Sequence, residues 1–365
     1  MKWSCIHLTV GQEGHPLTEI YGGDDIWAVA FTANGEYIVG GGHGDEAGVW
    51  RVEDGKQIAT LAAKLVTCLA VSKDGRWIAA GTFDGEVIMW DAKTFEQVFS
   101  HKEGTYIHGV DFSPDSTRLV TASGNRTATV WNVATRKKVQ RLGHKTPVTA
   151  AKYSPQGDRI ATATRKSVQV WDSNDGRLLV DISVKVTPSC NTGLLWCNNH
   201  LFIVSDSEIK QLEASTGSAL SEWSVPKITD SSCIALPKHA EFIAYTTQDT
   251  VTFWDTSTHT QLGLIKHTQH IHSIQVALSP DGRSLAIGED GGKITIRSVS
   301  RITVSDMFLR IMAHLNNVLV PLVFPNMIQS RCLVYIPLSR NLTFRSTMLR
   351  SSHGSTISSR TRTRY

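Results

Sequence analysis

Alternating apolar and polar residues that run into short polar turns recur along the first three hundred residues of this chain. In VQVWDSNDGRLLV, at 168–180, the alternation ends near Trp171, and Ser173 to Gly176 separate it from a second apolar run. An alternation of period two that meets Ser, Asn, Asp and Gly predicts a strand, a tight turn and a second strand. We therefore expect this segment to form a β-hairpin.

The same hairpin pattern returns at a nearly constant spacing. The residue that closes its first strand follows its predecessor by 40 to 43 positions, and these residues are Trp50, Trp90, Trp131, Trp171, Leu212, Trp254 and Arg297. A column of residues some twenty positions earlier keeps this spacing, and its members are Phe31, Val71, Phe112, Tyr153, Trp196, Leu236 and Leu278. Two columns with one period predict seven structural repeats.

This period also indicates how the chain is organised into domains. A chain of 365 residues could form two or more domains of average size. However, a unit of about 40 residues with three or four strands needs its neighbours to cover its faces. We therefore expect one closed all-β body, with its core divided among the sheets. The 41% hydrophobic and 19% charged residues are typical of a folded soluble protein.

The repeats resemble those of the WD40 family, in a degenerate form of fungal type. The resemblance covers about 15–300 and depends on Trp-Asp at 90–91, 171–172 and 254–255, on Ser-Pro-Asp-Gly at 279–282, and on the period. It implies a seven-bladed β-propeller over residues 1–300, closed by an N-terminal outer strand, Leu17 to Tyr21. The inner strands of the blades are then expected near 26–51, 66–91, 107–132, 147–172, 191–213, 231–255 and 273–298.

The resemblance also implies structural roles for several side chains. In WD40 blades a buried network of His, Ser or Thr, Asp and Trp often gives the indole N–H, which can only donate, an acceptor. In this chain such a network would include His101, Ser123 and Trp131 in blade three, and Asp84 and Trp90 in blade two.

The Trp position is filled unevenly around the ring. Trp50, Trp171 and Trp254 occupy it in blades one, four and six, whereas Leu212 and Arg297 replace Trp in blades five and seven. Because the replacements cannot form the same network, we expect blades five and seven to be the least stable.

The cysteines predict a reducing compartment. None of the six forms a C-x2-C pair, and Cys68 and Cys233 occupy a small-residue position of the repeat, which favours buried free thiols. The opening MKWSCIHLTV lacks the long apolar run of a secretory signal. We therefore expect a cytoplasmic or nuclear protein.

The sequence offers no constellation for catalysis. GGGHGDE at 40–46 lacks the Gly-Lys-Ser/Thr of a phosphate-binding loop and is expected to be a turn between strands. His267, His270 and His272 lie in one connecting loop, where a structural or surface role is favoured over metal binding. We expect a non-enzymatic protein without a metal or a cofactor.

The resemblance instead implies a surface that binds partners. In WD40 proteins the loops at one rim commonly bind peptides or domains. The equivalent residues of this chain are Trp27, Phe83, Tyr106, His108, Thr149, Arg165, Lys166 and His272. Aromatic residues and Arg are enriched at interface hot spots, although Trp27 could instead plug the channel. The resemblance thus implies a scaffold for protein or peptide partners that is monomeric outside its complex.

The C-terminal part departs from the repeat in pattern and in charge. Residues 301–365 contain nine Arg, no Lys and one acidic residue, whereas the first 300 residues carry a net charge of −4. We therefore do not expect the propeller to bind nucleic acid or a membrane. The basic tail could do so, and this is the alternative function.

The tail itself divides into two segments. Residues 301–338 are apolar, but His, Asn and Pro within them argue against a membrane span and leave a packed helix as one alternative. Residues 339–365 are rich in Ser, Thr and Arg and are expected to be disordered. The loss of Lys and Glu after residue 306 is also typical of translation through an intron or in a shifted frame.

Overall fold

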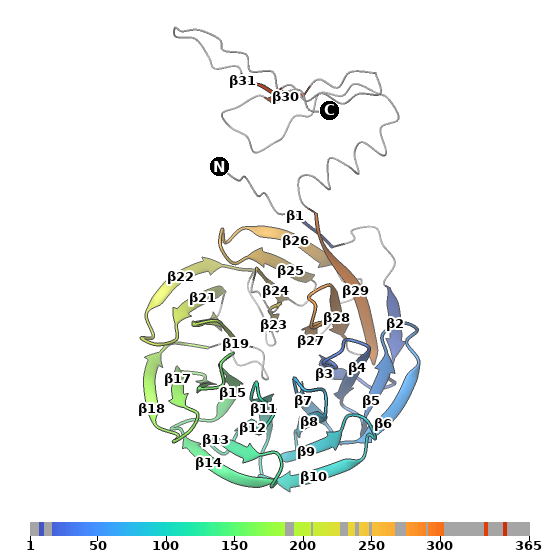
Figure 1. Cartoon of the computed structure of the whole chain (residues 1–365), viewed down its shortest axis with the longest axis vertical. Helices are drawn as coiled ribbons and strands as arrows, with labels where there is room; N and C mark the ends of the chain where they lie inside the picture. Colours follow the sequence, from blue (N-terminus) through green and yellow to red (C-terminus); the bar gives the residue numbers. More distant parts are fainter. Residues whose placement is uncertain are drawn as a thin grey trace, which may run out of the picture. The chain divides into compact units, whose positions relative to one another are not determined.

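The computed structural model describes residues 7–10, 17–186, 193–205, 207–226, 233–237, 241–247, 250–266, 275–289, 291–302, 332–334 and 346–348. All regular secondary structure in these residues is β. Seven antiparallel sheets surround a central axis, as Figure 1 shows. The predicted all-β, seven-bladed propeller is confirmed.

Within each blade the strands follow the chain from the axis outward (Figure 1). Blades one and two consist of β3 (Ile26–Phe31), β4 (Tyr37–Gly42), β5 (Glu46–Arg51) and β6 (Gln57–Ala62), and of β7 (Val66–Val71), β8 (Trp77–Thr82), β9 (Glu86–Asp91) and β10 (Gln97–Lys102). Blades three and four consist of β11 (Ile107–Phe112), β12 (Arg118–Ser123), β13 (Thr127–Asn132) and β14 (Lys137–Gly143), and of β15 (Val148–Tyr153), β16 (Arg159–Thr164), β17 (Ser167–Asp172) and β18 (Leu178–Ser183).

The remaining blades have shorter inner strands. Blades five and six consist of β19 (Leu194–Cys197), β20 (His200–Ser205), β21 (Glu208–Glu213) and β22 (Ala219–Ser224), and of β23 (Ile234–Ala235), β24 (Phe242–Thr246), β25 (Thr250–Asp255) and β26 (Gln261–Lys266). Blade seven contains β27 (Gln275–Leu278), β28 (Ser284–Gly288) and the longer β29 (Lys293–Ile302).

Two N-terminal strands pair with β29 and close the ring. Strand β2 (Thr18–Tyr21) lies antiparallel to β29, with Thr18 opposite Ile296, and Glu19 forms an ion pair with Lys293 at 2.6 Å. The predicted closure by an N-terminal outer strand is confirmed. The sequence pattern did not predict β1 (His7–Val10), which pairs with the last four residues of β29.

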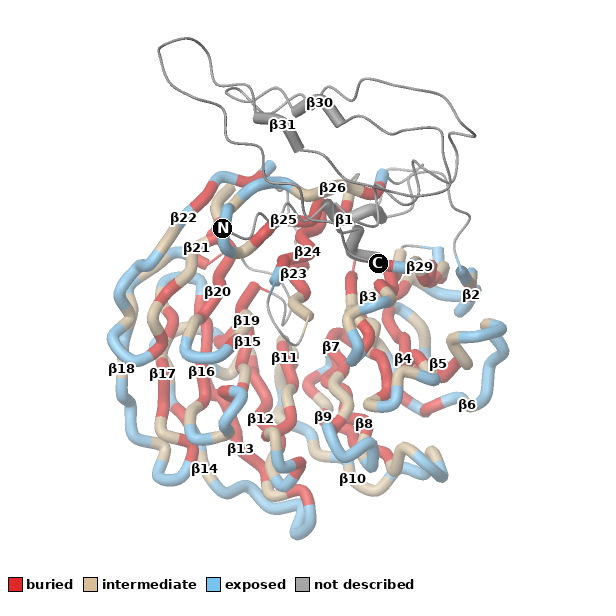
Figure 2. The backbone as a smooth tube through the Cα atoms, turned by 45° about the horizontal axis from the view of Figure 1, so that its top comes forward, coloured by how far each residue is buried: buried red, intermediate tan, exposed pale blue. Residues whose placement is uncertain are grey.

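The buried apolar residues that the structure describes form seven clusters, each between two neighbouring blades. Ile20 of β2 joins Ile38 and Trp50 of blade one and Ile294 of blade seven in the cluster that completes the circle. Strand β8 is buried at five of its six residues, whereas none of the six residues of β18 is buried (Figure 2). Middle strands are buried because neighbouring blades cover both of their faces.

Short polar motifs form the turns at one end of each blade. The carboxylate of Asp91 accepts the backbone N–H groups of Lys93 and Thr94 at 2.8 and 2.9 Å. These bonds, that of Thr94 first, lower the pKa of Asp91. Ser113 donates to Asp115 at 2.5 Å and accepts the N–H of Arg118 at 2.9 Å. The Asp of Trp-Asp and the Ser-Pro-Asp motif thus satisfy backbone groups that the strands leave unpaired.

The glycines of GGGHGDE correct one expectation. Three of them end strand β4 rather than forming a turn, and the turn is confined to 43–45. A Cβ on Gly42 would lie 1.8 Å from the carbonyl oxygen of Asp25, and one on Gly48 would lie 2.2 Å from the indole of Trp50. Glycine is therefore required here for close packing of backbone and ring.

The chain divides into a propeller unit, which covers 6–302, and a second unit, to which 1–5 and 303–365 are assigned. In that second unit the described residues are β30 (Cys332–Val334) and its antiparallel partner β31 (Ser346–Met348). The packed helix and the disordered segment predicted for the tail fall mostly outside the described residues, and both stay predictions.

Candidate functional site

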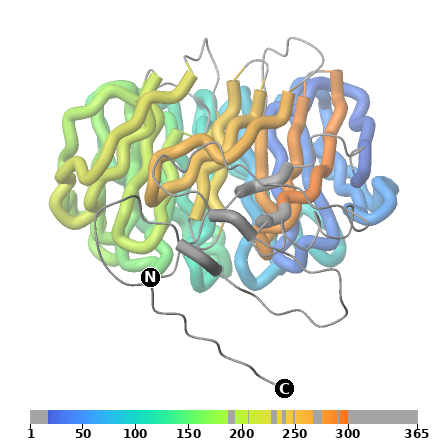
Figure 3. Tube along the Cα trace, turned by 90° about the horizontal axis from the view of Figure 1, so that it is seen from above, coloured from blue at the N-terminus to red at the C-terminus, as the bar shows by residue number. Residues whose placement is uncertain are grey.

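The loops that join neighbouring blades lie at the same end of the propeller as the turns between second and third strands. This follows because successive strands of a blade alternate in direction, and Figure 3 shows the disc edge-on with strands running between its two faces. We call this end the contact rim. Its described loops in blades one to four are 22–25, 43–45, 63–65, 83–85, 103–106, 124–126, 144–147, 165–166 and 184–186.

Backbone hydrogen bonds fix these loops to one another. The N–H of Gly124 donates to the carbonyl of Tyr106 at 2.9 Å, and the N–H of His144 donates to the carbonyl of Arg126 at 2.9 Å. Equivalent bonds join the loops of blades one and two. Neighbouring rim loops are therefore linked by backbone hydrogen bonds, and the rim side chains project from loops whose backbone is fixed.

Three of the predicted rim residues form a row across blades two and three. The rings of Phe83 and Tyr106 meet edge to face at 5.0 Å, and those of Tyr106 and His108 are 4.2 Å apart. The Phe83 side chain is 53% exposed, and the other two are partly exposed. We call these three residues the aromatic row. Edge-to-face pairs of this kind hold their rings in one arrangement.

A β-bulge positions His108. The pairing between first and second strands shifts register at the second residue of β3, β7, β11 and β15, namely at Trp27, Thr67, His108 and Thr149. A bulge leaves one residue outside the ladder and re-aims its side chain. The strand pattern alone does not reveal this irregularity.

The four bulged residues differ in exposure. Trp27 is partly exposed and its ring lies 5.6 Å from that of His43. Thr149 is only 6% exposed, and its hydroxyl donates to the carbonyl of Ala163 at 3.2 Å. The structure therefore corrects the expected rim position of Thr149, whose hydroxyl is used inside its own blade.

Positive charge lies beside the aromatic row. Arg165 and Lys166 are exposed at the turn between β16 and β17 of blade four. Burial, and then the charge of Arg165, lower the pKa of His108 to about 4. The imidazole is therefore neutral at neutral pH, and the cationic character of this part of the rim comes from the Arg and Lys side chains.

The structure thus gathers Phe83, Tyr106, His108 and Arg165 from three blades, with Lys166 adjacent to Arg165 in the chain. Trp27 belongs to blade one and pairs with a different ring. The predicted rim residue His272, together with its two neighbouring histidines, lies outside the described residues. A binding role for the rim residues stays a prediction.

Blade four contains a complete His–Thr–Trp network that sequence analysis missed. Trp171 donates its indole N–H to the Thr162 hydroxyl at 2.8 Å, and His144 Nε2 lies 2.8 Å from the same oxygen. His144 Nδ1 lies 3.0 Å from the carbonyl of Leu142. The available signal was a His in the connection between blades three and four; in the register of the repeat it takes the position of Glu103, two residues beyond that of His101.

Blade three contains a reduced form of this network, and the expected acceptor was wrong. Trp131 donates to Thr121 at 3.3 Å rather than to Ser123, which accepts the N–H of Asn125 at the adjacent turn. The His101 ring lies 4.8 Å from the indole of Trp131. Ser123 is two residues farther along β12, beyond the reach of the indole.

The remaining expected structural residues vary. Trp50 and Trp90 are 4% and 1% exposed, and Trp254 is partly buried with its indole donating to Thr252 at 3.0 Å. Asp84 is exposed at the turn between β8 and β9, which corrects its expected place in a buried network. The turn carries its carboxylate away from the sheet interior.

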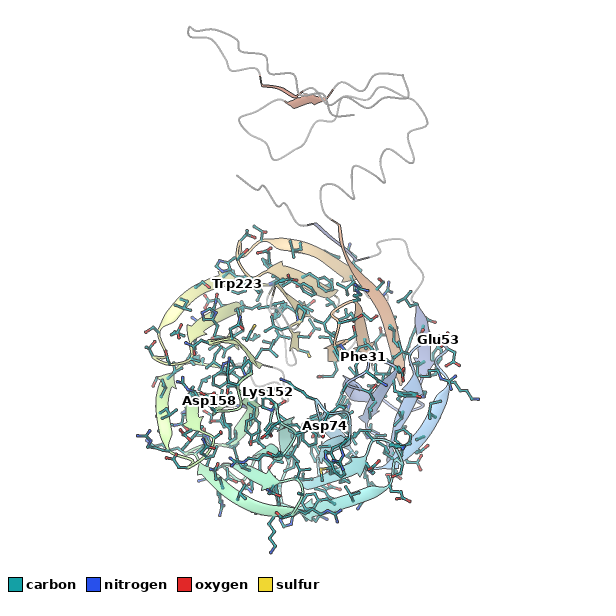
Figure 4. All side chains as sticks on the ribbon, viewed as in Figure 1. Phe31, Glu53, Asp74, Lys152, Asp158 and Trp223 are labelled. Carbon is teal, nitrogen blue, oxygen red and sulfur yellow. The ribbon has the colours of Figure 1, made fainter. Side chains whose placement is uncertain are left out.

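Near the axis, charged side chains join blades three and four. Lys152 lies close to the centre of the ring, whereas Glu53 lies at its periphery (Figure 4). Lys152 Nζ is 3.5 Å from Asp111 Oδ1, and the other oxygen of Asp111 accepts the N–H of Tyr153 at 2.8 Å. These bonds tie the innermost strands β11 and β15 together.

A pocket of about 380 Å³ opens in blade one among glycines and acidic residues. Asp24, Asp25, Asp45 and Glu46 line it with Trp50. Over the residues the structure describes, no three His, Cys, Asp or Glu side chains are grouped as metal ligands require. Within the same residues no helix has the length and hydrophobicity needed to cross a membrane.

The comparisons with known proteins agree with this fold. Residues 55–91, 93–132 and 136–172 match the WD domain, G-beta repeat. The WD repeat-containing protein SL1-17 of Schistosoma mansoni is 32% identical to this chain over 32% of the chain and 40% of its own length.

Two further relatives are similar over a slightly shorter and a longer stretch, respectively. Actin-interacting protein 1 of Drosophila melanogaster is 33% identical over 29% of this chain and 18% of its own length. Pre-rRNA-processing protein crb3/ipi3 of Schizosaccharomyces pombe is 27% identical over 38% of this chain and 36% of its own. The match thus spans less than half of each relative. Three WD40 repeats thus lie between residues 55 and 172, within a seven-bladed propeller formed by the described residues of 6–302.

Proposed function

We propose that the propeller is a non-enzymatic scaffold whose contact rim binds a protein or peptide partner within a larger assembly. The observation that carries the proposal is the aromatic row beside Arg165 and Lys166, on loops fixed by backbone hydrogen bonds. Large rings and Arg dominate binding energy at interfaces. A fixed backbone lowers the entropy lost on binding, because little has to be ordered.

The relatives support a platform whose partner differs from protein to protein. One is named for an interaction with actin and another for pre-rRNA processing. A shared fold does not fix a shared partner, since binding depends on the side chains displayed by the rim. We propose an intracellular protein of the cytoplasm or nucleus that is monomeric outside its complex.

Affinity purification with mass spectrometry tests this function. The comparison uses the full chain, a Trp27→Ala/Tyr106→Ala variant, and residues 1–302. A matched control, Tyr21→Ala/Leu178→Ala, removes side chains that are 69% and 41% exposed on outer strands. We expect partners to be retained by the control and by residues 1–302, and lost from the rim variant.

The opposite pattern would contradict the proposal. Partners that persist in the rim variant but disappear from residues 1–302 would place the function in the basic tail. Such binding would also weaken steeply with salt if its target were nucleic acid.

A further inference from the structure

Five basic side chains lie on the loops of blades three and four, at the same rim as the aromatic row. These exposed residues are Arg126, Lys145, Arg165, Lys166 and Lys185. None of them forms an ion pair with another residue that the structure describes. Elsewhere on the propeller, Lys152, Lys210 and Lys293 are each paired with a carboxylate.

Among the described residues of these loops, no exposed carboxylate offsets this charge, whereas in blade two the aromatic row has one exposed carboxylate beside it, Asp84, which follows Phe83 in its turn. The rim loops of blades three and four between residues 124 and 186 contain no Asp or Glu. Glu103 lies between Phe83 and Tyr106 in the chain, but its side chain is only 1% exposed and its Oε1 lies 3.9 Å from Lys138 Nζ. The positive charge is therefore available to a ligand.

The cations and the aromatic row form one surface. Tyr106 is hydrogen-bonded to the loop that contains Arg126, and that loop is bonded in turn to the connection that contains Lys145. Arg165 acts electrostatically on His108, which lies against Tyr106. We call the aromatic row together with the five cations the basic-aromatic surface.

The same rim is negative in blade one. Asp24, Asp25, Asp45 and Glu46 lie at its loops or directly beside them, and of these four only Asp45 forms an ion pair with a residue that the structure describes, Lys64 at 3.1 Å. A nucleic acid that extends past blade three would bring its phosphates toward these carboxylates. A short acidic peptide would avoid them, so the charge pattern favours a peptide.

Resting on the function proposed above, we propose that the basic-aromatic surface binds an acidic peptide segment that carries an apolar or aromatic side chain. Arg165 and Lys166 pair with its carboxylates, since a guanidinium binds a carboxylate through two parallel N–H bonds. Phe83 and Tyr106 bury its apolar side chain. Neutral His108 adds no charge to the surface at neutral pH.

The test is selection of a phage-displayed library of random dodecapeptides on the purified full chain. Selected peptides are then measured by fluorescence anisotropy against Arg165→Glu/Lys166→Glu and Tyr106→Ala. The control, Arg136→Glu/Lys137→Glu, makes the same change of charge at the exposed turn between β13 and β14, at the opposite end of the blade. A single-stranded oligonucleotide of similar length is the competing probe.

We expect the selected peptides to be rich in Asp and Glu around an apolar residue. Arg165→Glu/Lys166→Glu should weaken them by about tenfold or more, because attraction becomes like-charge repulsion, while the control stays within about twofold because exposed distant charges are screened. Binding should also weaken as salt is raised.

The other outcomes separate two kinds of failure. Neutral or basic peptides that depend on Tyr106 but not on Arg165 would refute the acidic ligand and leave the rim as a binding surface. If an oligonucleotide binds more tightly than the peptides and its binding depends on the same cations, the ligand of this surface is nucleic acid and the peptide proposal is wrong. Peptides whose affinity is unchanged by both Tyr106→Ala and Arg165→Glu/Lys166→Glu would refute the proposed function as well.

Discussion

The Thr162 hydroxyl satisfies two side chains from different strands and loops. A carbonyl only accepts, so His144 Nδ1 must donate to Leu142, and a neutral imidazole then has an accepting Nε2. The Thr162 hydroxyl donates to that nitrogen and accepts the indole N–H of Trp171. Every polar atom of the network is satisfied with a neutral His144, and burial is the first cause that lowers its pKa to about 4.

Replacing Thr162 by Val should destabilise the propeller by about 1–3 kcal/mol, because it leaves the polar atoms of two largely buried rings without partners. The matched control is Thr121→Val in blade three, where Thr121 accepts from Trp131 at 3.3 Å and has no hydrogen bond with His101. We expect a smaller loss there. Urea unfolding of both variants measures the difference, and equal losses would show that the histidine does not contribute.

The same network predicts a pH dependence. The pKa of His144 is 6.5 in the unfolded chain and about 4 in the folded one, so its contribution is fully present above pH 6.5. As pH falls from 6.5 to 4, the unfolded state binds the proton first and stability is lost, by an amount of the order of 3 kcal/mol. His108 acts in the same direction.

Unfolding free energies measured between pH 7 and pH 4 check this prediction. In His144→Gln the fall over this range should be clearly smaller than in the unsubstituted chain. The lowered carboxyl pKa values of Asp91 and Asp255 act at lower pH, so they do not obscure the comparison. An unchanged slope in the variant would contradict the assigned role.

At the level of elements, strand β2 joins the two ends of the propeller. Its Ile20 is 2% exposed and packs between blades seven and one. A propeller whose last sheet lacks its outer strand exposes an unpaired edge and opens this core cluster. The contribution of β2 to the stability of the propeller therefore exceeds that of the hydrogen bonds of its four residues alone.

Ile20→Ala should cost about 2–4 kcal/mol, the usual range for truncating a buried Ile. Leu17→Ala is the control, because Leu17 directly precedes β2 and is 62% exposed. Guanidinium unfolding of the two variants measures how much stability is lost at the buried position and at the exposed one. A similar small loss in both would mean that closure contributes little to stability.

At the level of the whole molecule, residues 6–302 form the propeller unit. The end of β29 lies inside this unit, since Val299 is 5% exposed and the last four residues pair with β1. Truncations that end only a few residues apart near the end of β29 should therefore differ in the stability of the ring.

A chain ending at Ile302 should unfold at the same temperature as the full chain, whereas one ending at Ser298 should unfold at a lower temperature. The shorter chain loses the buried Val299 and the pairing partner of β1. Thermal unfolding followed by circular dichroism compares the three. Equal midpoints for the two truncated chains would show that β1 adds nothing, and a loss on cutting at Ile302 would show that the tail stabilises the ring.

The sequence by itself determined the number of blades and the all-β fold, and the family resemblance that it carries implied the closing strand. A fixed period of about 40 residues sets how many units the chain contains, and period-two alternation sets which side chains each strand buries. Both can be read along the chain without knowledge of any contact between strands. The Trp position and the apolar column therefore predicted the fold correctly.

Only the tertiary structure decided which hydroxyl meets each indole. Trp131 lies opposite Leu119, so the nearest hydroxyl is two residues on, at Thr121, and not at Ser123. The equivalent residue in blade two is Ala80, which offers no acceptor to its Trp. The register of strand pairing determines which side chains are neighbours, and the sequence pattern does not predict that register to the residue.

The contact surface was likewise decided in three dimensions. Phe83, Tyr106 and Arg165 come from three blades and are more than twenty residues apart from one another in the chain. The bulge that re-aims His108 and buries its counterpart Thr149 leaves no mark in the apolar pattern. Sequence patterns describe each strand relative to itself, whereas contacts between blades depend on how whole sheets pack side by side.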